Sequence, residues 1–337
     1  MMEQRKKLNP VMIMLILGLF IIIAFIMSMN TGFSRLSPVD VIKTLLGEGT
    51  EKQNLILFDF RLPRILIAIL AGAGLAVSGA ILQGVSRNSL ADPGILGINA
   101  GAGLAVVLFI SFFSNEQNVP VLFMPILALA GAGVTAALIY ILAYKKGRGI
   151  SPTRLLLVGI AVGSGISAAM IVLTTRMDQG KFEYAAVWLA GSIWGTNWKF
   201  VFALLPWIMF LIPYAIYKSR DLNLLNLGEP IAMGLGARVE WERFSLLAAA
   251  VGLAGSCVAV GGSIGFLGLM GPHLARRLVG PRYQFLLPTS ALIGGLLLLV
   301  ADIFARVLIQ PTEIPTGIVV SAIGGPYFLY LLAKSKD

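Results

Sequence analysis

Long apolar runs recur along the whole of this chain, and they constrain its fold more than any other feature of the sequence. A helix of about 20 residues crosses the roughly 30 Å hydrocarbon core of a bilayer and satisfies its own backbone hydrogen bonds. Hydrophobic residues make up 57% of the chain and charged residues only 12%. The sequence therefore predicts an all-α, multi-pass integral membrane protein with a single transmembrane domain over residues 1–337.

Ten membrane spans are expected from the positions of these runs. Their predicted limits are 11–29, 62–86, 93–113, 120–144, 152–174, 197–217, 240–262, 264–280, 286–308 and 314–334. We expect the first run to be a retained span, because no small-x-small cleavage site follows it. The eighth is short enough to be partly re-entrant. Residues 180–191 are expected to form an interfacial helix, because Trp188, Trp194 and Trp198 cluster there.

Basic residues predict the orientation of the bundle. If the N-terminus is cytoplasmic, the inner segments hold about twice as many Lys and Arg residues as the outer ones. We therefore expect both termini in the cytoplasm, with the chain in the cell membrane. The net charge of +10 then reflects orientation. Nucleic acid is not an expected partner, because its binding needs a basic face on a folded soluble surface.

A faint internal repeat connects the two halves of the chain. The segment Gly74–Ser78 is echoed by Gly252–Ser256, and Pro93 is echoed by Pro272 at nearly the same offset. The two segments fall on the second and seventh spans, which are five apart and therefore run in opposite directions. Inverted repeats are common in transporters, so we expect inverted five-helix repeats.

The second and third spans are rich in Gly, Ala and Ser, and a short polar turn at 88–94 joins them. Small residues allow helix backbones to approach closely in a bilayer. This pattern is typical of the wall of a transport pathway rather than of a lipid anchor. The expected pathway-lining positions are Gly72, Gly74, Ser78, Gly79, Gly97 and Gly101.

Residues that could carry covalent chemistry are few. No G-x-x-x-x-G-K-[ST] motif occurs, so the chain is not expected to bind ATP through a phosphate loop. His273 is the only histidine, expected as a structural residue at a helix end, and Cys257 is the only cysteine. A lone histidine offers neither a metal cluster nor a nucleophile–base pair. We expect no catalytic residue, no metal and no cofactor, and therefore no enzyme activity in this chain.

The loop between the sixth and seventh spans, at about 221–239, is expected to contain two short amphipathic helices. Asp221 or Asn223 is expected to cap the first helix, and Gly228 to break the chain after it. Glu229 and Pro230 are expected to open the second helix, and Gly234 and Gly236 to end it. The loop either lies on the membrane surface or docks into a groove on a soluble partner. The pattern alone leaves both interpretations open.

Ionisable residues near the outer ends of spans allow two interpretations. Asp302 and Arg306 stand four apart on one helix face and are expected to neutralise each other. Arg61 and Arg64 flank a Leu-Pro pair at the start of the second span. They either extend to lipid headgroups or, with Arg306, receive carboxylates of a docking protein. No mid-membrane chain of acidic or histidine residues is present, which counts against a proton-driven secondary transporter.

Seven segments, in consistent order from about residue 55 to residue 332, resemble the FecCD family of permease subunits. The segments are RLPR, GAGLAVSGAILQG, LADPGILGINAGAG, LGEPIAMGLGARV, GSIGFLGLMGPHLARRLVG, LLPTSALIGGLLLLVADIFAR and EIPTGIVVSAIGGPYFLYLL. These permeases serve ABC importers of iron-siderophores, haem and cobalamin. The resemblance implies a type II ABC importer permease with ten helices.

The resemblance also implies partners. These are a cytoplasmic ABC ATPase dimer, an extracellular or periplasmic substrate-binding protein, and a second permease copy or a homologous sister permease, with the path on the dimer axis. A ferric siderophore is the expected substrate. Cobalamin and haem are alternative substrates for the same type of ABC importer. An alternative of another functional class is a secondary transporter that works without an ATPase.

Two groups of residues match functional positions of the family. Arg61, Arg64 and Arg306 match positions that meet acidic residues of the binding protein. The loop at 222–239 matches the coupling helices that contact the ATPase, which favours docking over the membrane surface. The expected coupling residues are Leu224, Leu225, Gly228, Glu229, Pro230, Ile231, Ala232, Met233, Gly234, Leu235 and Gly236.

Overall fold

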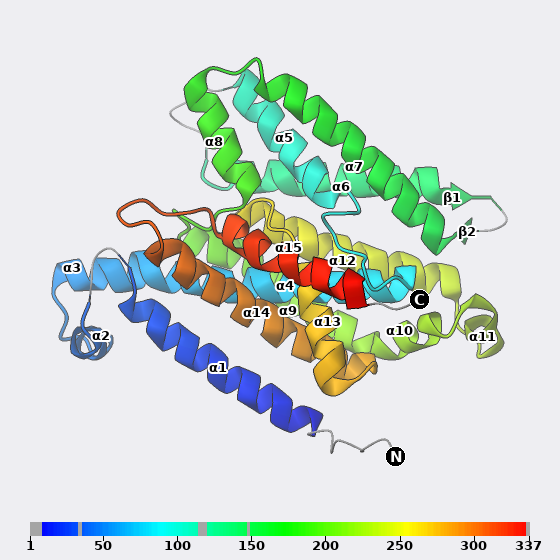
Figure 1. The fold of residues 1–337 in the computed structure, drawn as a ribbon, viewed down its shortest axis with the longest axis horizontal. Coiled ribbons are helices and arrows are strands. Elements are labelled where there is room, and N and C mark those ends of the chain that lie inside the picture. Colours follow the sequence, from blue (N-terminus) through cyan, green and yellow to red (C-terminus); the bar gives the residue numbers. More distant parts are fainter. Residues whose placement is uncertain (1–8, 33–35, 114–119, 147–148, 335–337) are drawn as a thin grey trace.

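The computed structural model describes residues 9–32, 36–113, 120–146 and 149–334, and ten helices in this part match the ten predicted spans (Figure 1). They are α1 (Pro10–Asn30), α4 (Leu62–Ser86), α5 (Ile98–Phe112), α6 (Phe123–Ala143), α7 (Pro152–Thr174), α9 (Trp198–Tyr217), α12 (Val239–Gly261), α13 (Leu267–Val279), α14 (Tyr283–Val307) and α15 (Thr316–Lys334). The shorter elements are α2 (Pro38–Leu45), α3 (Glu51–Asn54), the π-helix η1 (Leu55–Arg61), α8 (Gln179–Ala190), α10 (Ser219–Asn226), α11 (Glu229–Gly234), β1 (Tyr144–Lys145) and β2 (Gly149–Ile150).

Seven of the helical segments in the described residues are long and apolar enough to cross a membrane. Of the remaining spans, α5 and α13 are shorter, with 15 and 13 residues. The short eighth span is confirmed in α13. The third span begins at Ile98 rather than at residue 93, because residues 87–97 form an irregular turn in which Arg87 and Gly97 adopt positive φ angles.

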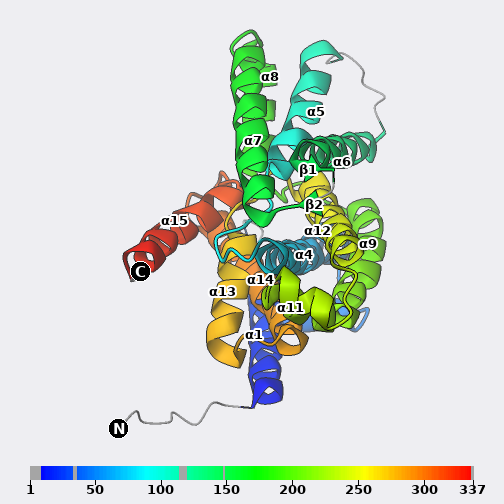
Figure 2. The same cartoon turned by 90° about the vertical axis from the view of Figure 1, so that its right-hand side faces the viewer.

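α4 is the central helix of the bundle. It packs against α14, α12, α13 and α9 (Figure 2). Every residue from Ala71 to Ser86 is buried. α4 and α12 lie side by side and run in opposite directions, as the predicted inverted repeat requires. The serine of the first repeat segment, Ser78, donates a hydrogen bond to the carbonyl oxygen of Ala250 on α12 at 2.7 Å.

A second layer is formed by α5, α6, α7 and α8, which stand to one side of the bundle around α4 (Figure 2). α5 packs against α6 and α7, and α6 packs on α12. In α7, only Leu155, Gly159 and Gly163 are buried. The predicted interfacial helix is confirmed as a helix in α8, where the side chain of Asp178 accepts a hydrogen bond from the backbone N–H of Lys181.

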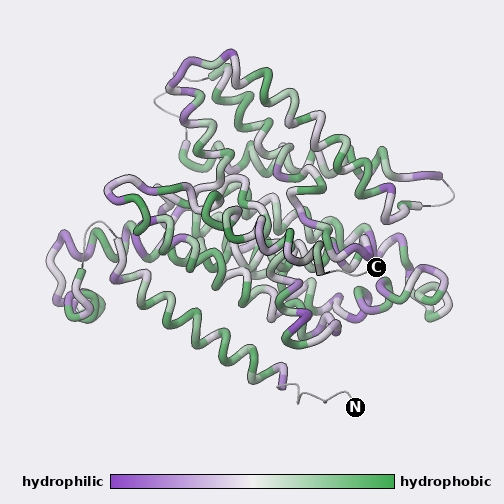
Figure 3. Tube along the Cα trace, viewed as in Figure 1, coloured by the Kyte–Doolittle hydropathy of each residue, from purple (hydrophilic) through white to green (hydrophobic). Residues whose placement is uncertain are grey.

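The two ends of the bundle differ in the elements that they carry (Figure 1). α2, α3 and η1 lie at one end, called here the α2 end, and α10, α11 and the β1–β2 hairpin lie at the other, called the α11 end. The start of α1 and the end of α15 both point toward the α11 end. Hydrophilic segments gather at these ends, while the long helices between them are mostly hydrophobic (Figure 3).

Candidate functional sites at the two ends of the bundle

Two short helices form between α9 and α12, as the sequence predicts. Gly228, at a φ of +107°, separates α10 from α11, and Pro230 lies in the first turn of α11. The predicted cap of α10 is wrong, because α10 begins at Ser219, two residues before Asp221. Asp221 instead forms an ion pair with Lys218 at 3.2 Å. The side chain of Asn223 donates a hydrogen bond to Gln284 and accepts one from the backbone N–H of Tyr283.

Ion pairs hold this loop against the first turns of α12. Lys218 Nζ lies 2.6 Å from Glu242, and Arg243 Nη2 lies 2.5 Å from Glu229 of α11. The buried Arg243 also donates to the carbonyl oxygen of Ile150, which ties the β1–β2 hairpin to the same turn. The hydrogen bond with Glu242 raises the pKa of Lys218, which favours the charged form of its ammonium group. Sequence reasoning missed these contacts, since the residues of the two ion pairs lie 24 and 14 positions apart and Arg243 lies 93 positions from Ile150.

The expected coupling residues divide into an inward and an outward set. Leu225, Gly228 and Ala232 are buried against the bundle, and Leu224 and Glu229 are half-buried. Pro230, Gly234 and Gly236 are exposed. The expected residues Ile231, Met233 and Leu235 point outward. Together with Leu227, which the sequence did not single out, they have exposures of 53–62%, and we call these four side chains the α11 knob. A cluster of exposed apolar side chains within a polar loop is typical of a protein contact.

At the α2 end, the structure brings the three predicted arginines together, with Arg61 and Arg306 buried and Arg64 half-buried. Arg64 lies 2.8 Å from Asp302 and 2.7 Å from Glu313, and Arg306 lies 3.1 Å from Asp302. The Asp302 side chain is fully buried. The expected Asp302–Arg306 pair is therefore confirmed. Sequence reasoning missed that Arg64 and Glu313 extend this pair into a network of four charges.

Arg61 and Arg306 hold the end of α1. Arg306 donates to the carbonyl oxygens of Ser28 and Thr31, at 3.2 and 2.8 Å, and Arg61 donates to that of Met29. Their exposed fractions are only 6% for Arg61 and 5% for Arg306. Buried charges are costly unless they are paired and hydrogen-bonded, so these contacts are part of the fold.

The six small residues expected to line a pathway lie instead at helix crossings inside the chain, and all six are buried. A Cβ on Gly72 or Gly79 would overlap the backbone of Gly294 or Gly268, respectively. The remaining contacts are Gly74 with Cys257 and Ile208, Ser78 with Ala250, Gly97 with Gly159 and Gly163, and Gly101 with Thr135 and Gly131. Close packing explains the small side chains, and we assign these positions to helix contacts rather than to the pathway wall.

The remaining candidate side chains are isolated. Cys257 is a buried thiol without a disulfide partner. His273 lies inside α13 rather than at its end, with its ring 6.0 Å from that of Tyr327. Among the described residues, no group of three or more His, Cys, Asp or Glu side chains is placed to hold a metal ion.

Comparison with known proteins identifies the fold and the family. A model of the FecCD transport family matches residues 20–334. The iron(3+)-hydroxamate import system permease protein FhuG of Bacillus subtilis (strain 168) is 51% identical over 335 residues, which cover 98% of this chain and 99% of the relative. The Fe(3+)-citrate import system permease protein YfmE of the same organism is 46% identical over 328 residues, covering 97% of this chain and 96% of the relative.

A solved structure agrees with this match. An inward-facing conformation of a metal-chelate type ABC transporter superposes with a TM-score of 0.84 at 32% identity, over 96% of this chain and 99% of that one. The predicted all-α architecture of a type II ABC importer permease is therefore confirmed. The chain belongs to the FecCD transport family and is a permease, a transport subunit that spans the membrane.

Proposed function

We propose that this permease moves a ferric siderophore across the cell membrane, powered by a separate ATPase. The observation that carries the proposal is the 51% identity, along almost the whole chain, to a permease named for iron(3+)-hydroxamate import. The relative named for ferric citrate import supports a ferric chelate in general. Ferric hydroxamates are therefore the first substrates to test.

The α11 knob is the proposed contact with the ATPase dimer. Its four apolar side chains project from a loop that is attached rigidly to α12 by the Lys218–Glu242 and Arg243–Glu229 pairs. Movement of an ATPase against the knob would therefore be passed to α12, and from α12 to α4, which packs against it. With the α11 end in the cytoplasm, both termini are cytoplasmic, in agreement with the excess of basic residues there.

The α2 end is the proposed docking face for the substrate-binding protein. Arg61, Arg64 and Arg306 remain the proposed region of contact, but the three have different shares in it. Arg64 keeps an exposed side-chain fraction of 11% beside the more exposed Glu313, whereas Arg61 and Arg306 are engaged with the end of α1. We infer that Arg64 meets the partner and that the other two arginines shape the surface around it.

A second permease, either another copy or a sister chain, is the proposed partner within the membrane. α7 supports this, because only three of its 23 residues are buried within the chain. Its exposed apolar residues include Leu157, Ile160, Ile171 and Val172. The translocation path is then formed between the two permeases and not inside one of them, which agrees with the closed packing around α4.

Docking can be tested with a photo-crosslinking amino acid placed at Thr312, an exposed position one residue before Glu313. We expect crosslinks to the loaded binding protein there, and a lower yield when Arg64→Gln is added. The matched control is the same amino acid at Tyr144, which is exposed at the α11 end. Equal yields at both positions, or none at Thr312, would contradict docking at the α2 end.

The substrate is tested by radio-iron uptake in cells that lack this chain and in cells complemented with it. The panel is a set of ferric hydroxamates, ferric citrate and haem, with labelled cobalamin beside them. We expect loss of ferric hydroxamate uptake and its recovery on complementation. Loss confined to haem or cobalamin would show that the permease serves another chelate.

A further inference from the structure

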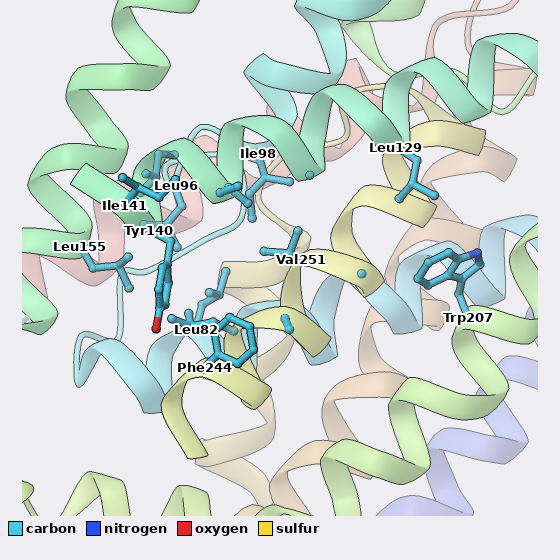
Figure 4. Close-up of a pocket in the computed structure, with 17 residues that line it drawn as sticks. Leu82, Leu96, Ile98, Leu129, Tyr140, Ile141, Leu155, Trp207, Phe244 and Val251 are labelled. Atoms are coloured by element: carbon cyan, nitrogen blue, oxygen red, sulfur yellow. The ribbon is translucent and has the colours of Figure 1, made fainter. Parts of the chain in front are cut away.

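An apolar groove of about 480 Å³ lies between α6 and α12 (Figure 4). Tyr140, Leu155 and Phe244 lie at one end of it, and Leu129 and Trp207 lie at the other. Tyr140 and Phe244 meet edge to face, with ring centroids 5.5 Å apart. The residues that line the groove are hydrophobic or glycine. Their only polar side-chain groups are the hydroxyl of Tyr140 and the indole N–H of Trp207.

The groove has about the length of one bilayer leaflet. Its two main walls, α6 and α12, are both long and apolar enough to cross a membrane, so we infer that lipid tails surround it. From Leu129 to Tyr140, α6 advances about 16 Å at 1.5 Å per residue, close to the roughly 15 Å of hydrocarbon in one leaflet. Gly133 lies midway, and no atom comes within 4 Å of where its Cβ would be. The groove is therefore open at its centre.

The end of the groove near Tyr140 has the chemistry of a headgroup region. Trp241 and Phe244 lie with ring centroids 6.0 Å apart, so aromatic rings gather at this level. The chain continues from Tyr140 into β1, where Lys145 is exposed, and Lys146, directly after β1, is exposed as well. Arg154 is half-buried next to Leu155. Basic residues beside a groove between spans are suited to an anionic lipid headgroup.

We propose that this groove binds one acyl chain of an anionic phospholipid, with the headgroup phosphate near Lys145, Lys146 and Arg154. The acyl chain fills the space over Gly133, and its end reaches Trp207. In the orientation proposed above, the α11 end is cytoplasmic, so the bound lipid belongs to the cytoplasmic leaflet. The groove itself does not depend on that orientation or on the substrate.

The test uses the purified full chain in detergent after delipidation, with phosphatidylglycerol as the probe and native mass spectrometry as the readout of retained lipid. The variant Gly133→Leu fills the groove without meeting any neighbour at its Cβ. We expect about tenfold weaker retention, the effect of displacing roughly two buried methylenes. Gly18→Leu on α1 is the matched control, because Gly18 also has no atom within 4 Å of its Cβ position, and we expect retention there to be unchanged.

The headgroup is tested separately with the double variant Lys145→Gln, Lys146→Gln. We expect weaker retention of phosphatidylglycerol and unchanged retention of phosphatidylcholine. Undiminished phosphatidylglycerol in Gly133→Leu would overturn the proposal. A change in the oligomeric mass of Gly133→Leu without loss of lipid would also overturn it, because the groove would then be a contact between permease copies. Equal retention of both lipids by the unaltered chain would overturn the anionic headgroup.

Discussion

At the scale of single residues, the bundle depends on glycines where helix backbones meet. Gly79 of α4 lies against Gly268 at the start of α13, and Gly72 lies against Gly294 of α14. At the α4–α13 crossing, the side chain of Gln83 also donates a hydrogen bond to the carbonyl oxygen of Gly268, at 3.2 Å. Close approach of backbones is a main source of helix association in a bilayer, where lipid tails are as apolar as leucine.

The variant Gly79→Ala places a methyl group against the carbonyl oxygen of Gly268 and forces α4 and α13 apart. Overpacking of this kind costs about 1–3 kcal/mol. We expect a correspondingly lower stability in an SDS unfolding titration of the detergent-solubilised protein. Gly133→Ala is the control, because its Cβ would meet open space. Equal stability of the two variants would show that the crossing tolerates a side chain.

At the scale of elements, the charge network at the α2 end joins helices that are distant in the sequence. Asp302 of α14 binds Arg64 of α4, and Arg306 of α14 binds the end of α1. α1 has few buried residues of its own. We infer that these polar contacts hold α1 in place, because its apolar contacts with the bundle are sparse.

Asp302→Asn removes the carboxylate that Arg64 and Arg306 share, and leaves the buried Arg306 without its ion-pair partner. Breaking a buried pair typically costs about 3–5 kcal/mol. We expect loss of stability on that scale and easier proteolysis after α1. Glu313→Gln, at a more exposed pair, is expected to cost at most about 1 kcal/mol. Similar effects of both substitutions would contradict the central place of Asp302.

The α11 knob can be tested without disturbing its support. Ile231→Ser with Met233→Ser changes two exposed side chains and leaves the Arg243–Glu229 pair intact. We expect the ATPase to dissociate from the permease during purification, or to lose its stimulation by loaded binding protein. Leu278→Ser, a substitution of another exposed leucine at the end of α13, is the control. An ATPase that stays bound and stimulated would contradict coupling through the knob.

At the scale of the whole molecule, the sequence predicted the spans well and the site residues less well. Apolar runs have a period and a length, so the ten helices and both helices of the α11 loop could be located from the sequence. A glycine-rich helix has the same composition at a crossing and at a pathway wall. The surroundings of Gly79 decide between the two, and they come from Gly268, far away in the chain.

The arginines show the same limit. Their spacing predicted the Asp302–Arg306 pair, because both residues are on one helix turn. The contact of Arg64 with Asp302 spans 238 positions, and those of Arg306 with α1 span more than 270. No local sequence pattern distinguishes an arginine that is buried in such contacts from one that is exposed and available to bind another protein.

The most direct test of ATP-driven import is accumulation of a radiolabelled ferric hydroxamate in proteoliposomes that contain this permease with its ATPase and binding protein. We predict accumulation that requires ATP hydrolysis and the binding protein and that persists when a protonophore collapses the proton gradient. Accumulation that follows the proton gradient and proceeds without ATP would contradict the account, and would make the chain a secondary transporter.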